Sequence, residues 1–187
     1  WCEKDDLYRN YHDNEWGKPV YDDETIFEFL ILETFQAGLS WYTVLAKREN
    51  FRKAFDNFDL KKIANYSEDK MAELAEDTGI IRNKLKIKAT VTNAQAFIKV
   101  QEEFGTFSKY IWGFVDEKPI DNKPKTLSEV KATTPISDAL SKDLKKRGFK
   151  FVGSTVMYAH MQATGLINDH WMSCPRYREV KALDQTF

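Results

Sequence analysis

One apolar run near the N-terminus constrains the fold more strongly than any other part of this sequence. Every residue from Ile26 to Leu32 is apolar except Glu28. At about 100° per residue, a helix of this composition is apolar almost all round, and such helices lie inside protein cores. The run therefore predicts a central buried helix, and the preceding stretch from Asp22 to Thr25 supplies a cap and an acidic first turn for it.

A carboxylate and an indole flank the end of this predicted helix. Glu33 follows the apolar run directly, Gly38 is expected to break the helix, and Trp41 stands eight residues after the carboxylate. Carboxylates are rarely fully buried without a partner, so two interpretations stay open. Either Glu33 and Trp41 hold a flat, hydrogen-bonding ligand, or Glu33 ends its helix by pairing with a lysine or capping a neighbouring element.

The remaining sequence reads as further helices. The longest predicted one runs from Ile81 to about Glu103, with apolar residues at three- and four-residue spacing. The stretch from Glu117 to Pro135 has three prolines and few apolar residues, so it is expected to be a surface connection. No strand-like alternation is found, and the predicted fold is all-α. A chain of 187 residues is long enough for one domain, which we expect to span residues 1–187.

The distribution of charge is more informative than its sum. The formal net charge is −1, which gives no argument for nucleic acid or a membrane as partner. However, five cations lie within nine residues against the single acid Asp143, while acids gather between Glu68 and Asp77. Such a basic stripe is the footprint expected of a phosphate contact, and the alternative is a solvated helix face. The five cations are Lys142, Lys145, Lys146, Arg147 and Lys150.

The basic stripe leads into a predicted helix-hairpin-helix at about residues 137–166. The first helix should end at Gly148, apolar residues should anchor the turn, and Gly153 should open the second helix. A glycine there lets backbone N–H groups approach a DNA phosphate, without reading the sequence. The alternative is an ordinary αα-hairpin with a glycine cap. The expected anchors are Phe149, Phe151 and Val152, and the expected contacts to the DNA backbone are Gly148, Lys150, Gly153 and Ser154.

Histidines and cysteines stand close together near both ends of the chain. His170 and Cys174 are four residues apart, and His12 and Cys2 lie in the N-terminal part. Zinc sites commonly use such spacing, so a Cys₂His₂ set would join the terminal segments 1–17 and 166–178; the same pattern also occurs without metal. Two cysteines do not form a disulfide framework. With no signal peptide or spanning segment recognised, a reducing, cytoplasmic setting is expected.

Five segments together resemble one family, and they follow its order over nearly the whole chain: Tyr11 to Gly17, Leu32 to Trp41, Gly79 to Arg82, Ser137 to Gly153, and Asn168 to His170. In these segments the chain resembles the 3-methyladenine DNA glycosylase I family. The resemblance implies a helix-hairpin-helix glycosylase fold whose termini are joined by a structural zinc ion. It also implies an enzyme of base excision repair, which hydrolyses the N-glycosidic bond of N3-methyladenine in alkylated double-stranded DNA and releases free 3-methyladenine. Because no lysine is recognised in a position for Schiff-base chemistry, the enzyme is expected to be monofunctional.

Residue roles in the pocket follow from this resemblance, position by position. Glu33, the expected catalytic residue, and Tyr11 should hydrogen-bond the excised base, Trp41 should stack on it, and Trp16 and Trp1 should wall the pocket. The base must first be flipped out of the duplex. Because methylation at N3 leaves adenine cationic, electron-rich indole faces and an ionised Glu33 should favour it over the neutral base.

The resemblance also implies a metal set. His12, His170 and Cys174 match three zinc ligands, and the family's fourth is a cysteine two positions before the residue that matches Trp1. We expect either that natural N-terminal residues are missing from this sequence or that Cys2 substitutes. The first reading is favoured, since Cys2 falls three positions after the family's ligand. Three protein ligands with a water molecule, or an empty site, would then result.

Several alternatives stay open at this point. A non-catalytic, zinc-stapled DNA-binding module would share the hairpin and the metal, but it gives no role to Glu33. A metal-dependent hydrolase would place His12, His170 and an acid around a catalytic zinc, whereas cysteine ligation and four protein ligands would indicate a structural ion. Asp169 is expected to be structural, because a cationic leaving group lessens the need for a strong general base. A monomer is expected.

Overall fold

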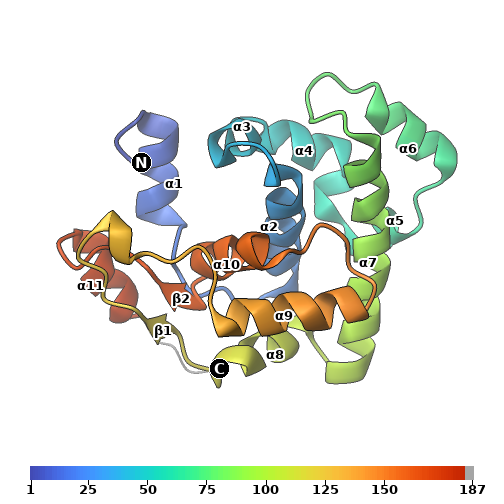
Figure 1. Cartoon of the computed structure of the whole chain (residues 1–187). Coiled ribbons are helices and arrows are strands. Elements are labelled where there is room, and N and C mark those ends of the chain that lie inside the picture. Colours follow the sequence, from blue (N-terminus) through green and yellow to red (C-terminus); the bar gives the residue numbers. More distant parts are fainter. Residues whose placement is uncertain (184–187) are drawn as a thin grey trace.

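Helix α2 (Asp23–Gln36) lies at the centre of the computed structural model, which describes residues 1–183 (Figure 1). All of its residues from Ile26 to Phe35 are buried, apart from the half-buried Glu28. The Asp22 carboxylate accepts a hydrogen bond of 2.9 Å from the Thr25 amide and so caps the helix. The predicted central helix and its N-cap are confirmed.

The other helices surround α2. The predicted long helix begins at Lys84 rather than Ile81, because the Asn83 side chain caps it by accepting a hydrogen bond from the Lys86 amide. Within residues 1–183, no helix is both long enough and apolar enough to span a bilayer. The remaining α-helices are α1 (Asp6–Asn14), α3 (Trp41–Ala46), α4 (Arg48–Ala54), α5 (Leu60–Ala64), α6 (Glu68–Ala75), α7 (Lys84–Phe104), α8 (Phe107–Trp112), α9 (Pro135–Lys146), α10 (Ser154–Ala163) and α11 (Pro175–Lys181), with 3₁₀ turns at Asp56–Phe58, Gly113–Val115 and Leu127–Glu129.

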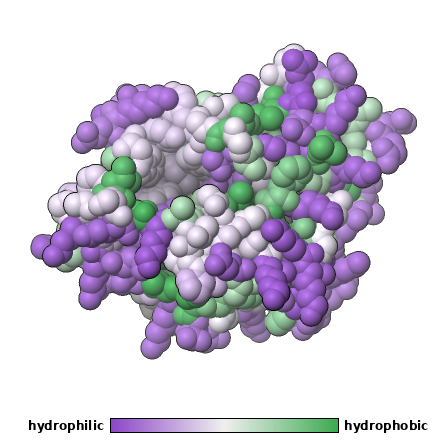
Figure 2. Space-filling view, in the orientation of Figure 1, coloured by the Kyte–Doolittle hydropathy of each residue, from purple (hydrophilic) through white to green (hydrophobic). Residues whose placement is uncertain are grey.

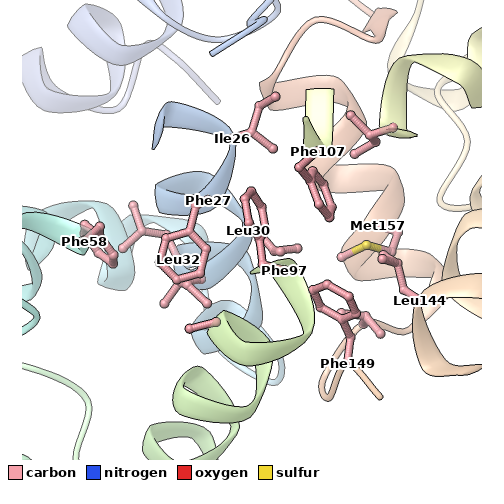
Figure 3. Packing of buried hydrophobic residues seen from close by; sticks show 14 of the residues in the cluster. Ile26, Phe27, Leu30, Leu32, Phe58, Phe97, Phe107, Leu144, Phe149 and Met157 are labelled. Atoms are coloured by element: carbon pink, nitrogen blue, oxygen red, sulfur yellow. The ribbon is translucent and has the colours of Figure 1, made fainter. Parts of the chain in front are cut away.

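The main core lies where α7, α8, α9 and α10 meet α2 (Figure 3). Phe97 of α7 and Phe107 of α8 stack with their ring centroids 4.1 Å apart, and Met157 of α10 is fully buried in the same cluster. Each such side chain contributes about 1.5–3 kcal/mol by leaving water. Asp23 fastens α8 to the core, because its carboxylate accepts hydrogen bonds from the amides of Phe107 and Ser108.

A short parallel ladder departs from the all-α prediction. β1 (Ile120–Asp121) pairs with β2 (Ile167–Asn168), with Ile120 opposite Ile167. Two residues are too few to give the alternation by which a strand is recognised in a sequence. The ladder attaches the connection between α8 and α9 to the chain that follows α10, so this connection is held to the body of the protein at its middle.

Candidate active site

Glu33 lies in the last turn of α2 and is only 3% exposed. Its carboxylate has no hydrogen bond or ion pair with another described residue, and burial raises its pKa to about 8. A pKa in that range leaves the carboxyl group mostly protonated at pH 7 when no cation is beside it, and an ionised Glu33 paired with the cationic base stays a prediction. The interpretation of Glu33 as a capping or lysine-paired residue is wrong.

Two further polar groups beside Glu33 are buried and have no partner. The hydroxyl group of Tyr11 and the indole Nε1 of Trp41 make no hydrogen bond to any residue that the structure describes, and the two rings lie 5.6 Å apart between centroids. Burial and then the charge of Glu33 hold the pKa of Tyr11 well above its usual value, which places these two groups within electrostatic reach. Buried polar groups are normally satisfied, so unpaired groups gathered in one place indicate a ligand site.

The local sequence explains how Trp41 returns to this site. Gly38 adopts a φ of +79°, in the left-handed region that side chains with a Cβ disfavour, and so permits the reversal after α2. Ser40 then caps α3 by accepting a hydrogen bond of 3.2 Å from the Thr43 amide. This short turn places Trp41 of α3 against Tyr11 of α1, although the two residues are thirty positions apart in the sequence.

Two more tryptophans extend the aromatic wall. Trp1 lies 6.2 Å from Tyr11 and 5.4 Å from Trp16 between ring centroids, and Trp16 packs on the cluster that contains Tyr11 and Phe29. Trp1 is 54% exposed, so it stands at the rim rather than in the wall's interior. Figure 2 shows a hollow between α1 and α3 on this face, with pale walls of intermediate hydropathy and the hydrophilic side chains of α1 outside it. The structure thus gathers the predicted base-binding residues Tyr11, Trp41, Trp16 and Trp1 around one place.

The three predicted metal ligands also meet. The donor atoms of His12, His170 and Cys174 all lie within 4.8 Å of one another, and Cys174 Sγ is 3.9 Å from His12 Nε2. His12 Nδ1 contacts the Asp13 carboxylate at 2.8 Å, and His170 Nε2 lies 2.9 Å from the Trp16 carbonyl oxygen.

These contacts leave one nitrogen of each imidazole ring for a metal, and His170 Nδ1 is buried without a partner. Outer contacts of this kind orient histidine ligands. The donor set therefore fits a zinc ion, with three protein ligands. Cys2 does not belong to this group, so the alternative in which Cys2 supplies the fourth ligand finds no support in the described residues.

Several hydrogen-bond donors of the hairpin between α9 and α10 are engaged within the protein. The amide of Gly148 donates to the Lys145 carbonyl oxygen at 3.1 Å, and the amide of Lys150 donates to the Asn93 side chain at 2.7 Å. The Ser154 hydroxyl donates to Asp138 at 2.6 Å. These three groups are therefore engaged within the protein, and the DNA contacts expected of Gly148 and Lys150 stay a prediction that their amides do not support.

The start of α10 remains open. Gly153 caps this helix without any side-chain hydrogen bond, and no atom lies within 4 Å of the place where a Cβ would stand. The first amides of a helix have no partner inside it, so the amides from Gly153 onward can bind an anion. Among the residues predicted to contact the DNA backbone, Gly153 and Ser154 have amides that are not used within residues 1–183. Lys150 has an exposed side chain, so its ammonium group is also available.

Two of the three predicted anchors of the hairpin are buried and the third is not. Phe149 is 2% exposed and points into the core beside Leu144 and Met157, as Figure 3 shows, and Val152 is also buried. Phe151 is 37% exposed, so the prediction that it anchors the turn is wrong. Phe151 has a φ of +57°, and this left-handed backbone directs its side chain away from the core into which Phe149 and Val152 point.

Comparisons with known proteins agree with this geometry. The family model described as methyladenine glycosylase matches residues 1–177. The DNA-3-methyladenine glycosylase 1 of Escherichia coli K12 is 49% identical over 177 residues, which cover 95% of each chain. A DNA-3-methyladenine glycosylase of Haemophilus influenzae is 47% identical over 175 residues, 94% of this chain and 95% of its own. This chain belongs to the methyladenine glycosylase family.

A solved structure of a member of this family agrees in fold as well. It is that of 3-methyladenine DNA glycosylase I from Staphylococcus aureus, described as the structural basis of 3-methyladenine recognition. It matches with a TM-score of 0.90 at 38% identity, and the match covers 92% of each chain. The resemblance drawn from five sequence segments is confirmed at the level of the family.

Asp169 takes part in a buried hydrogen-bond network in this methyladenine glycosylase. Its carboxylate accepts hydrogen bonds from the Tyr158 hydroxyl at 2.5 Å, from the Gln162 amide at 2.9 Å and from the Asn122 amide at 2.8 Å. With three donors, Asp169 is 2% exposed and fully occupied in joining α10 to the segments that follow β1 and β2. These contacts support the structural role expected for it.

Two polar residues of α7 support the site, and the sequence analysis missed both. Lys86 donates to the carbonyl oxygens of Phe35 and Ala37 at 2.8 and 2.5 Å, and so closes the end of α2 just after Glu33. Asn93 accepts from the Lys150 amide and donates to its carbonyl oxygen at 3.0 Å. Both are buried on the core side of α7, seven residues apart. Polar side chains inside an apolar helical stripe were the available signal.

Proposed function

We propose that this protein hydrolyses the N-glycosidic bond of N3-methyladenine in alkylated DNA as a monofunctional DNA glycosylase. Membership of the methyladenine glycosylase family supports this assignment, as do the names of its relatives in two bacteria. The observation that carries it is the buried Glu33 carboxyl group, together with the buried polar atoms of Tyr11 and Trp41 that have no partner among residues 1–183, inside an aromatic wall. A flat, positively charged base with hydrogen-bonding groups could pair with the Glu33 carboxylate and accept or donate hydrogen bonds at Tyr11 and Trp41.

The charge of the base decides how Glu33 acts. N3-methyladenine in DNA is cationic, and a positive charge beside Glu33 lowers the pKa of this carboxyl group from its value of about 8. The carboxylate then forms a buried ion pair with the base, while neutral adenine would leave Glu33 protonated. The Tyr11 hydroxyl and the Trp41 indole N–H add hydrogen bonds, and the indole faces attract the cation. Since the base leaves as a neutral molecule, the bond to be broken is already weak.

The hairpin holds the DNA while the base occupies the pocket. The free amides at the start of α10 and the Lys150 ammonium group bind phosphate oxygens, which carry no sequence information. The binding energy of this contact offsets part of the free energy needed to flip the base out of the duplex, which amounts to a few kcal/mol. The partner is thus an alkylated DNA duplex, and the product that leaves the pocket is free 3-methyladenine.

Release of bases from methylated DNA tests this function. The protein is incubated with duplex DNA treated with a methylating agent, and the released bases are separated by chromatography. We expect 3-methyladenine to appear in multiple turnovers, while 7-methylguanine and normal bases stay in the DNA. If folded protein binds the methylated duplex but releases no base, the non-catalytic DNA-binding module replaces the glycosylase as the function.

We further propose that His12, His170 and Cys174 hold a structural zinc ion that joins the two terminal segments. A zinc ion there supplies no chemistry to the pocket; it fixes α1 against the loop that carries His170. Elemental analysis of purified protein is expected to find about one zinc per chain in the wild type and much less in His170→Ala. A chelator should lower the melting temperature of the wild type but not that of the variant. Equal zinc content in both would contradict this assignment.

A further inference from the structure

The tip of the hairpin carries an aromatic side chain in a strained position. Phe151 has a φ of +57°, in the left-handed region that bulky residues avoid. Phe58 has a similar φ of +56°, but it is 5% exposed and packs in the core, so burial stabilises that conformation. Phe151 gains much less from burial, because it is 37% exposed and makes no ring contact within residues 1–183. Strained, exposed side chains of this kind are concentrated at functional sites.

The surroundings of Phe151 fit a polyanion with apolar faces. Lys150, directly before it, has an exposed side chain, and Lys145 and Lys146 are exposed at the end of α9. The free amides at the start of α10 begin two residues after it, at Gly153. One side of the hairpin therefore offers positive charge, anion-binding amides and a partly exposed phenyl ring. A DNA strand alternates phosphates with deoxyribose and base edges, and matches this combination.

We propose that Phe151 contacts a deoxyribose or base edge of the duplex, beside the phosphate that the α10 amides bind. This inference rests on the proposed function, because it takes DNA as the partner. Proteins that hold deformed DNA commonly insert apolar side chains such as phenylalanine between or against base steps. The contact is apolar, so it adds affinity that does not depend on salt, whereas each phosphate contact releases counterions and does depend on it.

Two variants separate this role from a structural one. Asparagine and glycine both tolerate left-handed backbone better than phenylalanine, so Phe151→Asn and Phe151→Gly should keep the hairpin and should not lower the melting temperature. The affinity for an undamaged DNA duplex is measured by fluorescence anisotropy over a range of salt concentrations. We expect both variants to bind about tenfold more weakly at every salt concentration, as is typical for loss of an aromatic contact to nucleic acid, with an unchanged slope of log K against log salt.

Two control variants show what the loss of a phosphate contact and the loss of an unrelated exposed apolar side chain do to DNA binding. Lys150→Met should reduce the salt slope by about one, because it removes one phosphate contact. Leu85→Ala removes a side chain that is 71% exposed on α7 and should change neither affinity nor slope. Binding of free 3-methyladenine should stay at the wild-type level in both Phe151 variants, since the pocket is untouched.

Three results would overturn the inference. DNA affinity at the wild-type level in both variants would show that Phe151 makes no contact. A lower salt slope would mean that Phe151 acts by shaping the anion-binding amides, and a lower melting temperature in both variants would show that it anchors the fold. Failure of the proposed function looks different, because the wild type would then release no 3-methyladenine while its DNA affinity could still be compared with that of the variants.

Discussion

Glu33→Gln is expected to reduce the release of 3-methyladenine from methylated DNA roughly 100-fold or more. The glutamine keeps the shape of the side chain but cannot carry the negative charge that pairs with the cationic base. Breaking a buried ion pair by removing one partner costs about 3–5 kcal/mol, which corresponds to a loss of that size. The measurement is single-turnover base release at saturating protein, together with the dissociation constant for free 3-methyladenine.

The pH dependence of the reaction should report the same group. Burial raises the pKa of Glu33 to about 8, and kcat/KM reflects ionisation in the free enzyme. The ionised form binds the cation, so kcat/KM should rise about tenfold per pH unit below 8 and level off above it. Glu33→Gln should show a flat profile over the same range. A flat wild-type profile between pH 6 and 9 would contradict the assignment of Glu33.

Asp169→Asn is the matched control for Glu33→Gln. Both changes convert a buried carboxyl group into an amide, but Asp169 belongs to the network with Tyr158 and Asn122 rather than to the pocket. Base release by Asp169→Asn should stay near the wild-type level wherever the protein is folded. Near-total loss in a folded Asp169→Asn protein would give Asp169 a catalytic role, and unchanged release in Glu33→Gln would remove Glu33 from the site.

Replacing His160 is expected to make the fold markedly more resistant to acid. His160 lies in α10 with no exposed surface, both of its ring nitrogens lack a partner among residues 1–183, and burial lowers its pKa to about 4. The unfolded chain takes up a proton near pH 6.5, while the folded protein does so only near pH 4. Stability from this residue is therefore complete above pH 6.5 and is lost as the pH falls to 4, by about 3 kcal/mol.

Urea unfolding of the wild type, His160→Phe and His160→Leu between pH 7.5 and 4.5 tests this expectation. The free energy of unfolding should fall less steeply with decreasing pH in both variants than in the wild type. Leucine guards against a ring that is too large for the space, since overpacking itself costs about 1–3 kcal/mol. Parallel curves for all three proteins would show that His160 is not the source of acid sensitivity.

The sequence predicted parts of the molecule that depend on local pattern. The apolar run of α2 and the cap at Asp22 depend on neighbouring residues only, and the structure has both. The pocket was predicted from family resemblance, because nothing local brings Tyr11 of α1 to Trp41 of α3. Phe151 was predicted to anchor the hairpin turn with Phe149 and Val152, and its exposure and left-handed backbone could not be read from the neighbouring residues.

Other features could not be predicted because they depend on distant contacts. The ladder between β1 and β2 is too short to leave a pattern. The protonation state of Glu33 depends on its burial and on the lack of a cationic neighbour among the described residues, and neither can be read from the residues next to it in the sequence. Lys86 and Asn93 looked like ordinary interruptions of an apolar stripe, and their partners lie 49 to 57 residues away in the chain.

Through Lys86 and Asn93, α7 sets the distance and the orientation between the pocket and the hairpin. Lys86 fixes the turn that follows Glu33, and Asn93 fixes the hairpin that we propose to face DNA; seven residues of helix set them about 10 Å apart. Inserting a single residue between them would rotate one loop by about 100° relative to the other. An inserted residue should therefore be tolerated far better in the connection between α8 and α9 than in α7 between Lys86 and Asn93.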